Sequence, residues 1–564
     1  MSPFRVLTVV LVVSALLLTV GSCRREPRGR CGRLIEELES PARAREAIRQ
    51  LGERQGDRSC ARAIPALAKM YEDGRYREDI LRTLRHIGKE DATEHPEYRT
   101  ILSSALENEV TGSLAANIIE QWELAELKDE VIALLELPDA HRARQAALRA
   151  LLEITKDNRE AIEDILMRLA VGDADRQGLR VNVMAVEELA KMRSTKAIPE
   201  IVKTMFLRTQ RGEEMYQAAR LALVKIGGEE VVEKLVATLE GENDSLRRFA
   251  RDRGVPDWEW QDGPKIAQVL GDLSDQSAAK AVAENMAKRL LEPAGVTDKA
   301  LDSWRISQSN RLTINMLTLA RIGDDSVVEI LAETIAGTDN DIKQRLDSAT
   351  ALAVIGTDNA IEALFKIYEE SEDQRFRAPL LLPLSLALNS ATLPRFDRIP
   401  VVEQRANAEL VLHSLGHDPI INGSYVVVQE CEGDDTECLI RNLNHEPEVD
   451  EESGEPEDGA AELSRARQWK AIIMLARKQD EVDTVIPALL EKFRSLPPDA
   501  TDLRNYSLIA LERVGRNDPR VYEGLEEILE EQRDKSGYDY WNLELEARIA
   551  SFNARQADSA ADDA

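Results

Sequence analysis

The sequence predicts an all-α fold, an α-α superhelix in which about a dozen helix pairs stack as a solenoid. Three segments that begin at Ala218, Asn315 and Ser348 align with one another without gaps. In each, an apolar helix ends at Ile-Gly, and an amphipathic helix follows a few polar residues later. No long stretch alternates apolar and polar residues as a half-buried strand would. Aromatic residues are only 4% of the chain, so the core must consist of Leu, Ile, Val and Ala.

The second helix of each segment carries its apolar residues on one face, at the spacing i, i+3, i+4, i+7. The aligned sets are Val232, Leu235, Val236, Leu239; Val328, Leu331, Ala332, Ile335; and Ile361, Leu364, Phe365, Tyr368. Further copies begin at Ile64, Ile162, Ile198, Ala279 and Val521. Each set needs a neighbour to cover it, because one helix pair cannot bury its own face.

The turns between these helices contain residues that are typical of helix ends and helix starts. Glycine is expected in a left-handed conformation at the end of the first helix, at Gly227, Gly323 and Gly356. Proline is expected in the first turn of the second helix, where no hydrogen bond is lost, at Pro65, Pro199 and Pro487.

The motif Ala-Ile-Pro-x-Leu/Ile, at Ala63–Leu67 and Ala197–Ile201, and Ile-Gly-Asp-Asp before a helix resemble HEAT repeats. The short, Gly-terminated form resembles the subgroup named after phycobilisome lyases. The resemblance assigns residues 41–417 and 467–535 to HEAT-like repeats, and it implies a protein-binding scaffold. A bilin-lyase activity would follow from fold analogy alone.

The amino terminus resembles a bacterial lipoprotein signal. Arg5 precedes fifteen uncharged residues, Val6–Val20, which is the length of a signal-peptide core and short for a membrane span. Val20-Gly21-Ser22-Cys23 then resembles the lipobox. It implies a signal peptide at 1–22, lipid (palmitate among it) on Cys23, and a basic tether at 23–40. Ordinary secretion and an uncleaved anchor remain the alternatives. Arg24 after the cysteine favours the outer over the inner membrane of the cell envelope, with the protein facing the periplasm or the exterior.

Four cysteines remain if Cys23 carries lipid, an even number for an oxidising compartment. Three pairings are possible. The short loop Cys431–Cys438, with Cys31 joined to Cys60, ranks above the long-range alternatives. A disulfide between Cys31 and Cys60 would stabilise the fold by roughly 3 kcal/mol in the chain-entropy model.

Two interruptions break the repeat. The first includes Trp258, Trp260 and Trp304, a candidate partner-binding loop, although such residues also cap exposed helix ends. The second, residues 418–466, is expected to be an irregular acidic insertion, with Ser424–Gln429 as a short strand or extended segment and a disordered run at 446–459. The last part, 536–564, is expected to be a helix with a frayed tail.

The cysteine loop contains four acidic residues, Glu432, Asp434, Asp435 and Glu437, whose carboxylates could bind calcium. Their spacing lacks the EF-hand pattern, so the sequence gives calcium binding little support.

The sequence contains no recognisable catalytic, metal or cofactor motif. The net charge of −30 argues against a protein that binds phosphates, so no nucleic acid is expected. We therefore expect a non-enzymatic, membrane-anchored scaffold that binds a protein or peptide. The acidity favours a basic partner, although the charge also serves solubility. The alternatives are a structural or assembly lipoprotein of an envelope complex and an enzyme on this fold.

Overall fold

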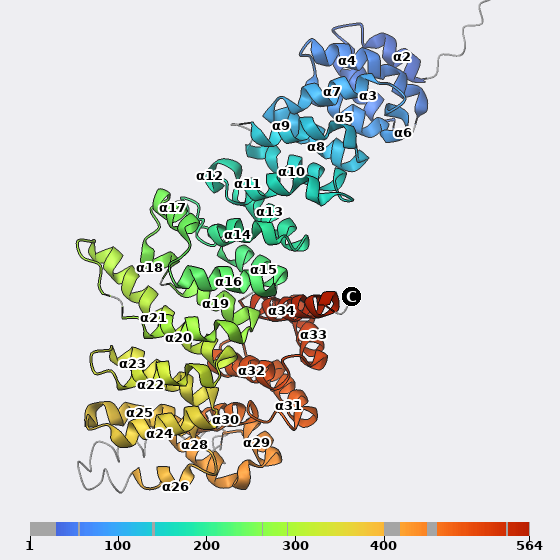
Figure 1. Cartoon of the computed structure of the whole chain (residues 1–564). Helices are drawn as coiled ribbons and strands as arrows, with labels where there is room; N and C mark the ends of the chain where they lie inside the picture. The colour runs from blue at the N-terminus through green and yellow to red at the C-terminus, as the bar shows by residue number, and fades with distance from the viewer. Residues whose placement is uncertain are drawn as a thin grey trace, which may run out of the picture. The chain divides into compact units, whose positions relative to one another are not determined.

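The computed structural model describes residues 30–54, 57–137, 141–261, 263–289, 291–399, 418–447, 459–536 and 540–562 (Figure 1). Within these ranges every regular element is a helix, and the one β-bridge joins Arg208 and Glu214. The predicted all-α fold class is thereby confirmed. The chain divides into two compact units. Unit 1 comprises Met1–Ile165 and Gly172–Asn182, and unit 2 comprises Leu166–Val171 and Val183–Ala564.

Unit 1 has two layers of stacked helices. The first layer contains α3 (Ala44–Gly52), α5 (Arg77–Ile87), α8 (Glu109–Trp122) and α10 (His141–Ile154), each in contact with the next. The second contains α4 (Ile64–Glu72), α7 (Glu97–Leu106) and α9 (Lys128–Glu136). Shorter helices are α2 (Arg30–Glu37), α6 (Lys89–Ala92) and α12 (Ala174–Gln177). Two helices span the boundary between the units, α11 (Glu163–Ala170) and α13 (Leu179–Lys191).

Unit 2 repeats the two-layer plan over a longer stack. Its inner layer is, in order, α15 (Tyr216–Ile226), α19 (Pro264–Leu273), α21 (Asp298–Ile322), α23 (Ile342–Ile355), α25 (Gln374–Ala387), α28 (Pro419–Glu430), α30 (Ala460–Leu475) and α32 (Thr501–Val514), and each contacts the next. Its outer layer is α14 (Ile198–Thr204), α16 (Gly228–Leu239), α20 (Ala279–Ala287), α22 (Val328–Ala336), α24 (Asp358–Glu370), α29 (Thr436–Leu443), α31 (Val482–Ser495) and α33 (Pro519–Ser536). The short helices α17 (Asp244–Asp252), α18 (Asp257–Trp260) and α26 (Leu393–Phe396) lie between repeats.

The stack of unit 2 turns back on itself. The last helix, α34 (Tyr540–Asp562), contacts α15 and α19, and α32 contacts α21. In Figure 1 the orange and red helices accordingly return beside the green and yellow ones. The inner layer of the first half is therefore covered by the inner layer of the second half, and it is not an open groove.

The periodic apolar faces form the core, as predicted. In α24 the set Ile361, Leu364, Phe365 and Tyr368 is at most 4% exposed. Burying such residues is the main favourable contribution to stacking.

The turn predictions hold in part. Gly227 and Gly356 both have φ of +64°, the left-handed conformation expected at a helix end. Gly323 is different, with φ −68° and ψ 143°, because the chain there extends into a turn in which Asp324 accepts a hydrogen bond from the Ser326 amide.

Two of the three prolines are confirmed. Pro65 and Pro199 lie in the first turns of α4 and α14. Pro487 lies inside α31, since that helix already begins at Val482.

The expected irregular insertion at 418–466 is wrong for its described part. Ser424–Gln429 belongs to helix α28, not to a strand, and α29 follows it. The Asp418 side chain caps the start of α28, and packing of the helix on α30 buries Val427 and Val428. Burial in a helix–helix interface thus overrides the β preference of the valine run. Most of the acidic run at 446–459 lies outside the described residues.

The expected frayed tail is also wrong, because α34 continues to Asp562. Its last turns are held by an ion pair of 2.8 Å between Arg193 and Asp558.

Candidate functional site

Six buried charges join the two halves of unit 2 where the stack closes. Arg220 of α15 pairs with Asp272 of α19 at 2.5 Å and with Glu544 of α34 at 2.7 Å. Arg321 of α21 pairs with Asp272 at 2.9 Å and with Glu512 of α32 at 2.8 Å. Arg548 of α34 completes the ring, at 2.8 Å from Glu544 and 3.6 Å from Glu512. Cations and anions alternate around this ionic ring, and no member's side chain is more than 6% exposed.

The electrostatics of the ring favour the charged forms of Glu544, Arg220 and Arg321. Burial alone would raise the pKa of Glu544, but Arg220 and Arg548 lower it well below the ordinary value. Burial opposes the charge of Arg220 and Arg321, yet their carboxylate partners raise both pKa values. The ring contains three arginines and three carboxylate residues, so its formal charges sum to zero. Its chemistry is structural: it specifies how the two halves align.

A second set of cations caps helix ends across the same interface. Arg513, just before the end of α32, donates to the Ala320 carbonyl at 2.9 Å and to the Ile355 carbonyl at 2.6 Å. Arg477, just after α30, donates to the Ala353 carbonyl at 3.0 Å. These carbonyls lie at the C-terminal ends of α21 and α23, where the helix dipole favours a positive charge. Burial lowers the pKa of each arginine to about 10, which leaves both charged at neutral pH.

Lys470 of α30 performs the same role for α25. Its amine donates to the carbonyls of Ser385, Leu386 and Leu388 at 3.2, 2.8 and 2.6 Å. Burial, together with the charge of Arg477, lowers the pKa of Lys470 well below its ordinary value. The three carbonyls oppose that shift, because they accept all three protons of the charged amine.

Beside the closure lies a surface groove of about 630 Å³, which we call the α33–α34 groove. Its apolar floor includes Leu529 of α33 and Ile549 of α34. Glu526 and Glu530 of α33 form an exposed wall one helical turn apart, and no described basic residue pairs with either. Lys225, Arg193 and Arg533 also line the groove, and Arg533 pairs there with Glu546. An apolar floor beside unpaired carboxylates can hold a basic, amphipathic segment of another protein.

The predicted cysteine pairs are both at disulfide distance. Cys31 and Cys60 are buried in unit 1, with Cα atoms 5.0 Å apart, and they join α2 to the 3₁₀ helix Arg58–Ala63. Cys431 and Cys438 have Cα atoms 5.4 Å apart and close the loop between α28 and α29.

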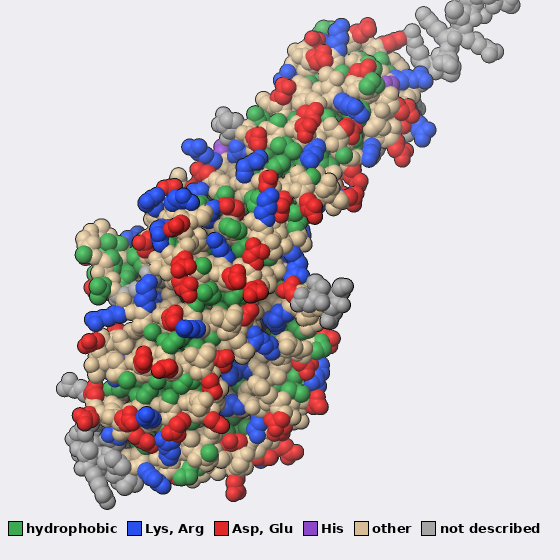
Figure 2. All heavy atoms as spheres, viewed as in Figure 1, with side chains coloured by type: hydrophobic (Ala, Val, Ile, Leu, Met, Phe, Trp, Pro, Cys, Tyr) green, Lys and Arg blue, Asp and Glu red, His purple; other side chains and the backbone are tan. Residues whose placement is uncertain are grey.

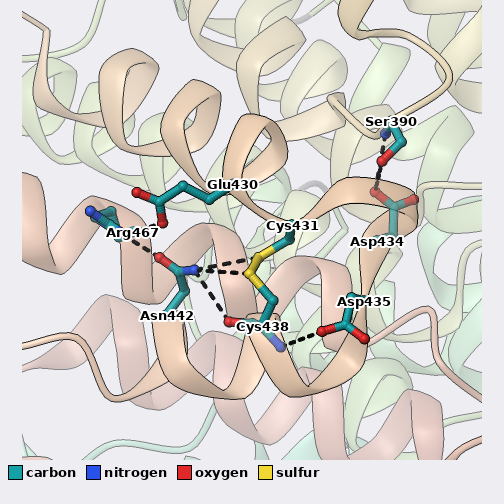
Figure 3. The surroundings of a disulfide bond; sticks show 8 residues. All are labelled: Ser390, Glu430, Cys431, Asp434, Asp435, Cys438, Asn442 and Arg467. Atoms are coloured by element: carbon teal, nitrogen blue, oxygen red, sulfur yellow. Dashed lines mark hydrogen bonds and ion pairs between the residues drawn. A yellow bond between two sulfur atoms is a disulfide. The ribbon is translucent and has the colours of Figure 1, made fainter.

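Figure 3 shows the surroundings of the second pair. Asp434 accepts hydrogen bonds from the Ser390 amide and hydroxyl at 3.0 and 2.8 Å, and Asp435 accepts one from the Cys438 amide at 2.8 Å. Asn442 donates to the Cys438 carbonyl at 3.2 Å and accepts from Arg467 of α30 at 2.9 Å. The loop's aspartates thus hold it to its neighbours. Within the described chain, the four loop carboxylates do not gather three ligand atoms in one place.

The structure does not present the predicted tryptophans as exposed anchors. Trp260 is 1% exposed, with its indole N–H donating to Asp257 at 3.0 Å, and Trp304 is 9% exposed. Only Trp258 is half-buried. The burial of Trp260 and Trp304 counts against a partner-binding role for these two residues.

Cys23 and the tether to residue 29 lie outside the described residues, so the lipid attachment stays a prediction. Among the helices that are described, none combines the length and the apolar character that a membrane span requires.

Sequence reasoning missed the ionic ring. Asp272 and Arg321 each directly precede the apolar residue that ends an inner helix, but so does Lys225, which is exposed. A charge at this place therefore does not by itself indicate a buried partner. The partner's position in the sequence cannot be obtained from the pattern.

Comparison with known proteins yields no family model that matches the chain and no similar curated protein. The class that the fold defines is an all-α helical solenoid.

Proposed function

We infer that the protein is a non-enzymatic, lipid-anchored scaffold of the bacterial cell envelope, built from HEAT-like repeats, and that it binds a protein partner through a basic segment. The α33–α34 groove carries this proposal. It is the place where an apolar floor and unpaired carboxylates, Glu526 and Glu530, lie together on the surface. A partner segment with basic residues spaced along a helix would bury its apolar side on Leu529 and Ile549 and pair with the wall.

The inner face of unit 2 does not compete for this role, because α32 and α34 cover it. We therefore propose that the partner binds on the outer side of the closure. A scaffold of this kind needs a rigid frame, and the ionic ring with its helix-capping cations supplies one. The lipid on Cys23 would keep the frame at a membrane, with several acyl chains needed for stable attachment.

Photo-crosslinking in cells tests the partner site. A photoreactive residue in place of Ala557, which is exposed and lines the groove, is expected to capture one partner. The double variant E526K/E530K should abolish that capture, since it reverses the charge of the wall. The matched control is E329K/E333K, which changes two exposed glutamates at the same spacing on α22.

Equal capture by both double variants would refute the groove as the binding site. A partner that is itself a multi-subunit membrane machine would favour the structural or assembly role instead. The anchor has a separate test: after a high-salt wash, which removes attachments that depend on charge, Cys23→Ser is expected to be released from the membrane fraction. A variant that stays with the membrane and keeps its hydrophobic start would contradict lipidation.

A further inference from the structure

One edge of unit 2, distant in sequence from the groove-lining helices α33 and α34, carries the two parts of the first repeat interruption, around Trp258 and before Trp304. It comprises α17, α18, residues 288–289 and 291–297, and the first turns of α21, which we call the α17–α21 edge. Helix α18 contacts both α17 and α21, so these two parts form one continuous surface. Figure 2 shows hydrophobic and basic side chains together where α17 and the start of α21 lie.

Exposed aliphatic side chains concentrate at this edge. Large hydrophobic residues that are exposed in the described chain number six, and three of them belong to the edge: Leu291 at 79%, Val296 at 43% and Ile306 at 62%. A fourth, Ile342 at 48%, lies between two residues that line the same depression as Trp304. Single exposed aliphatics need no explanation, but such a concentration marks a surface that is covered at times.

The aliphatic residues are held outward by specific contacts. Arg305 pairs with Glu292 at 3.1 Å, which fixes the segment against α21. Thr297 caps the start of α21 by accepting a hydrogen bond from the Ala300 amide at 3.3 Å. Arg311, which is buried, donates to the Lys288 carbonyl at 3.2 Å. The exposure of Leu291 and Val296 is therefore part of an ordered arrangement.

The same edge lacks the excess of acidic residues that the protein has as a whole. Its residues, counted through Ile306, include seven basic and seven acidic side chains, against 73 and 103 in the whole sequence. Four exposed cations of the edge have no carboxylate partner in the described structure: Arg248, Arg251, Arg289 and Lys299. Unpaired cations beside exposed aliphatic side chains are the combination that binds an anionic lipid surface.

We propose that the α17–α21 edge is a membrane-contact surface, which inserts Leu291, Val296 and Ile306 among acyl chains while Arg248, Arg251, Arg289 and Lys299 bind anionic headgroups. Aliphatic side chains on a protruding segment suit the interior of a lipid leaflet. A protein partner would more often require aromatic anchors in a pocket, and of the tryptophans here Trp260 and Trp304 are buried and Trp258 is half-buried. The contact does not depend on the groove or on the lipid at Cys23. It gives the scaffold a second point of attachment, and hence a defined orientation on the membrane.

The test places an environment-sensitive fluorophore (NBD) on the full chain through Leu291→Cys. The chain is mixed with vesicles of phosphatidylethanolamine and phosphatidylglycerol, and separately with phosphatidylcholine vesicles. Only the first mixture is expected to shift the emission to the blue and to permit quenching by spin labels within the acyl region. The same label at Glu527→Cys on α33 should report water in both mixtures. The chain without the Leu291→Cys change, labelled with NBD in the same way, measures the fluorescence that comes from labelling of Cys23.

The charge requirement has its own variant. R248E/R251E should abolish the blue shift at position 291, whereas R82E/K366E, the same charge change at exposed sites elsewhere, should preserve it. The Cys23→Ser chain should still show the shift, which separates this contact from the proposed anchor. The proposal would be overturned by no blue shift with either kind of vesicle, or by an equal blue shift with phosphatidylcholine vesicles. It would also be overturned if the blue shift appeared only when an acidic protein was added in place of the vesicles.

Discussion

Stacking and closure hold unit 2 together by different chemistry. Neighbouring inner helices such as α23 and α25 meet through periodic apolar residues, and the residues that make this contact lie within a few tens of positions of one another. The halves of the stack meet through the ionic ring and through cations on helix ends, for example between Arg477 and Ala353, 124 positions apart, and between Arg193 and Asp558, 365 positions apart. Apolar contacts tolerate adjustment, whereas six alternating charges are satisfied in one alignment only. Stacking thus builds the solenoid, and closure fixes its geometry.

Removal of Asp272 should have the largest effect on closure. The change D272A leaves Arg220 and Arg321 buried with one carboxylate fewer, and breaking a buried ion pair in this way destabilises a protein by about 3–5 kcal/mol. Urea unfolding measures the loss, and amide hydrogen exchange should become faster in α34.

The comparison variant is L364A in the stacking core, expected to cost about 2–5 kcal/mol. It should leave exchange in α34 nearly unchanged. Faster exchange of α34 in both variants would mean that stacking and closure are not separable.

Acid should open the closure before it disrupts stacking. The pKa of Glu544 is lowered in the folded protein, so its contribution to stability is complete above its ordinary value of 4.5 and is lost as the pH falls below it. Unfolding followed between pH 7 and pH 3 should show a steep loss in the native protein. The variant E544Q should be less stable at pH 7 and less sensitive to acid; an unchanged pH dependence would contradict the role of this carboxylate.

A smaller effect is expected at Gly227, where α34 crosses the end of α15. A Cβ atom there would lie 2.7 Å from the Ala554 Cβ, and φ is +64°. G227A should therefore destabilise by about 1–3 kcal/mol. The second change A554G should restore part of the loss by removing the clash, while the backbone strain remains. If A554G restored no stability, the loss in G227A would come from the backbone conformation alone.

The smallest effect is expected for one capping cation. R513M keeps much of the side-chain length but leaves the Ala320 and Ile355 carbonyls without their donor, for a loss of about 1–2 kcal/mol. Thermal unfolding measures it. A stabilised variant would indicate that burying the arginine costs more than its hydrogen bonds return.

The sequence predicts stacking well because its signals are local. Ile226 before Gly227 marks a helix end, and the apolar set from Ile361 marks a face, with no knowledge of distant residues. At Ser424–Gln429 the valine run misled the prediction, although Asp418-Pro419 was an available helix-start signal. Closure depends on pairs such as Arg193 and Asp558. Their separation in the sequence follows no repeat, so the repeat pattern cannot predict them. The cysteine pairs were predictable because short loops exclude most alternatives.

The contact of α15 with α34 has a consequence for how the chain is made. Arg220 of α15 and Glu544 of α34, whose side chains pair across this contact, lie 324 positions apart in the sequence, so α34 is synthesised long after α15. Until then Arg220 has one carboxylate partner, Asp272 of α19, and lacks the other. A chain interrupted before Tyr540 would leave the ring without Glu544 and Arg548, and with it the ionic link from α34 to α15.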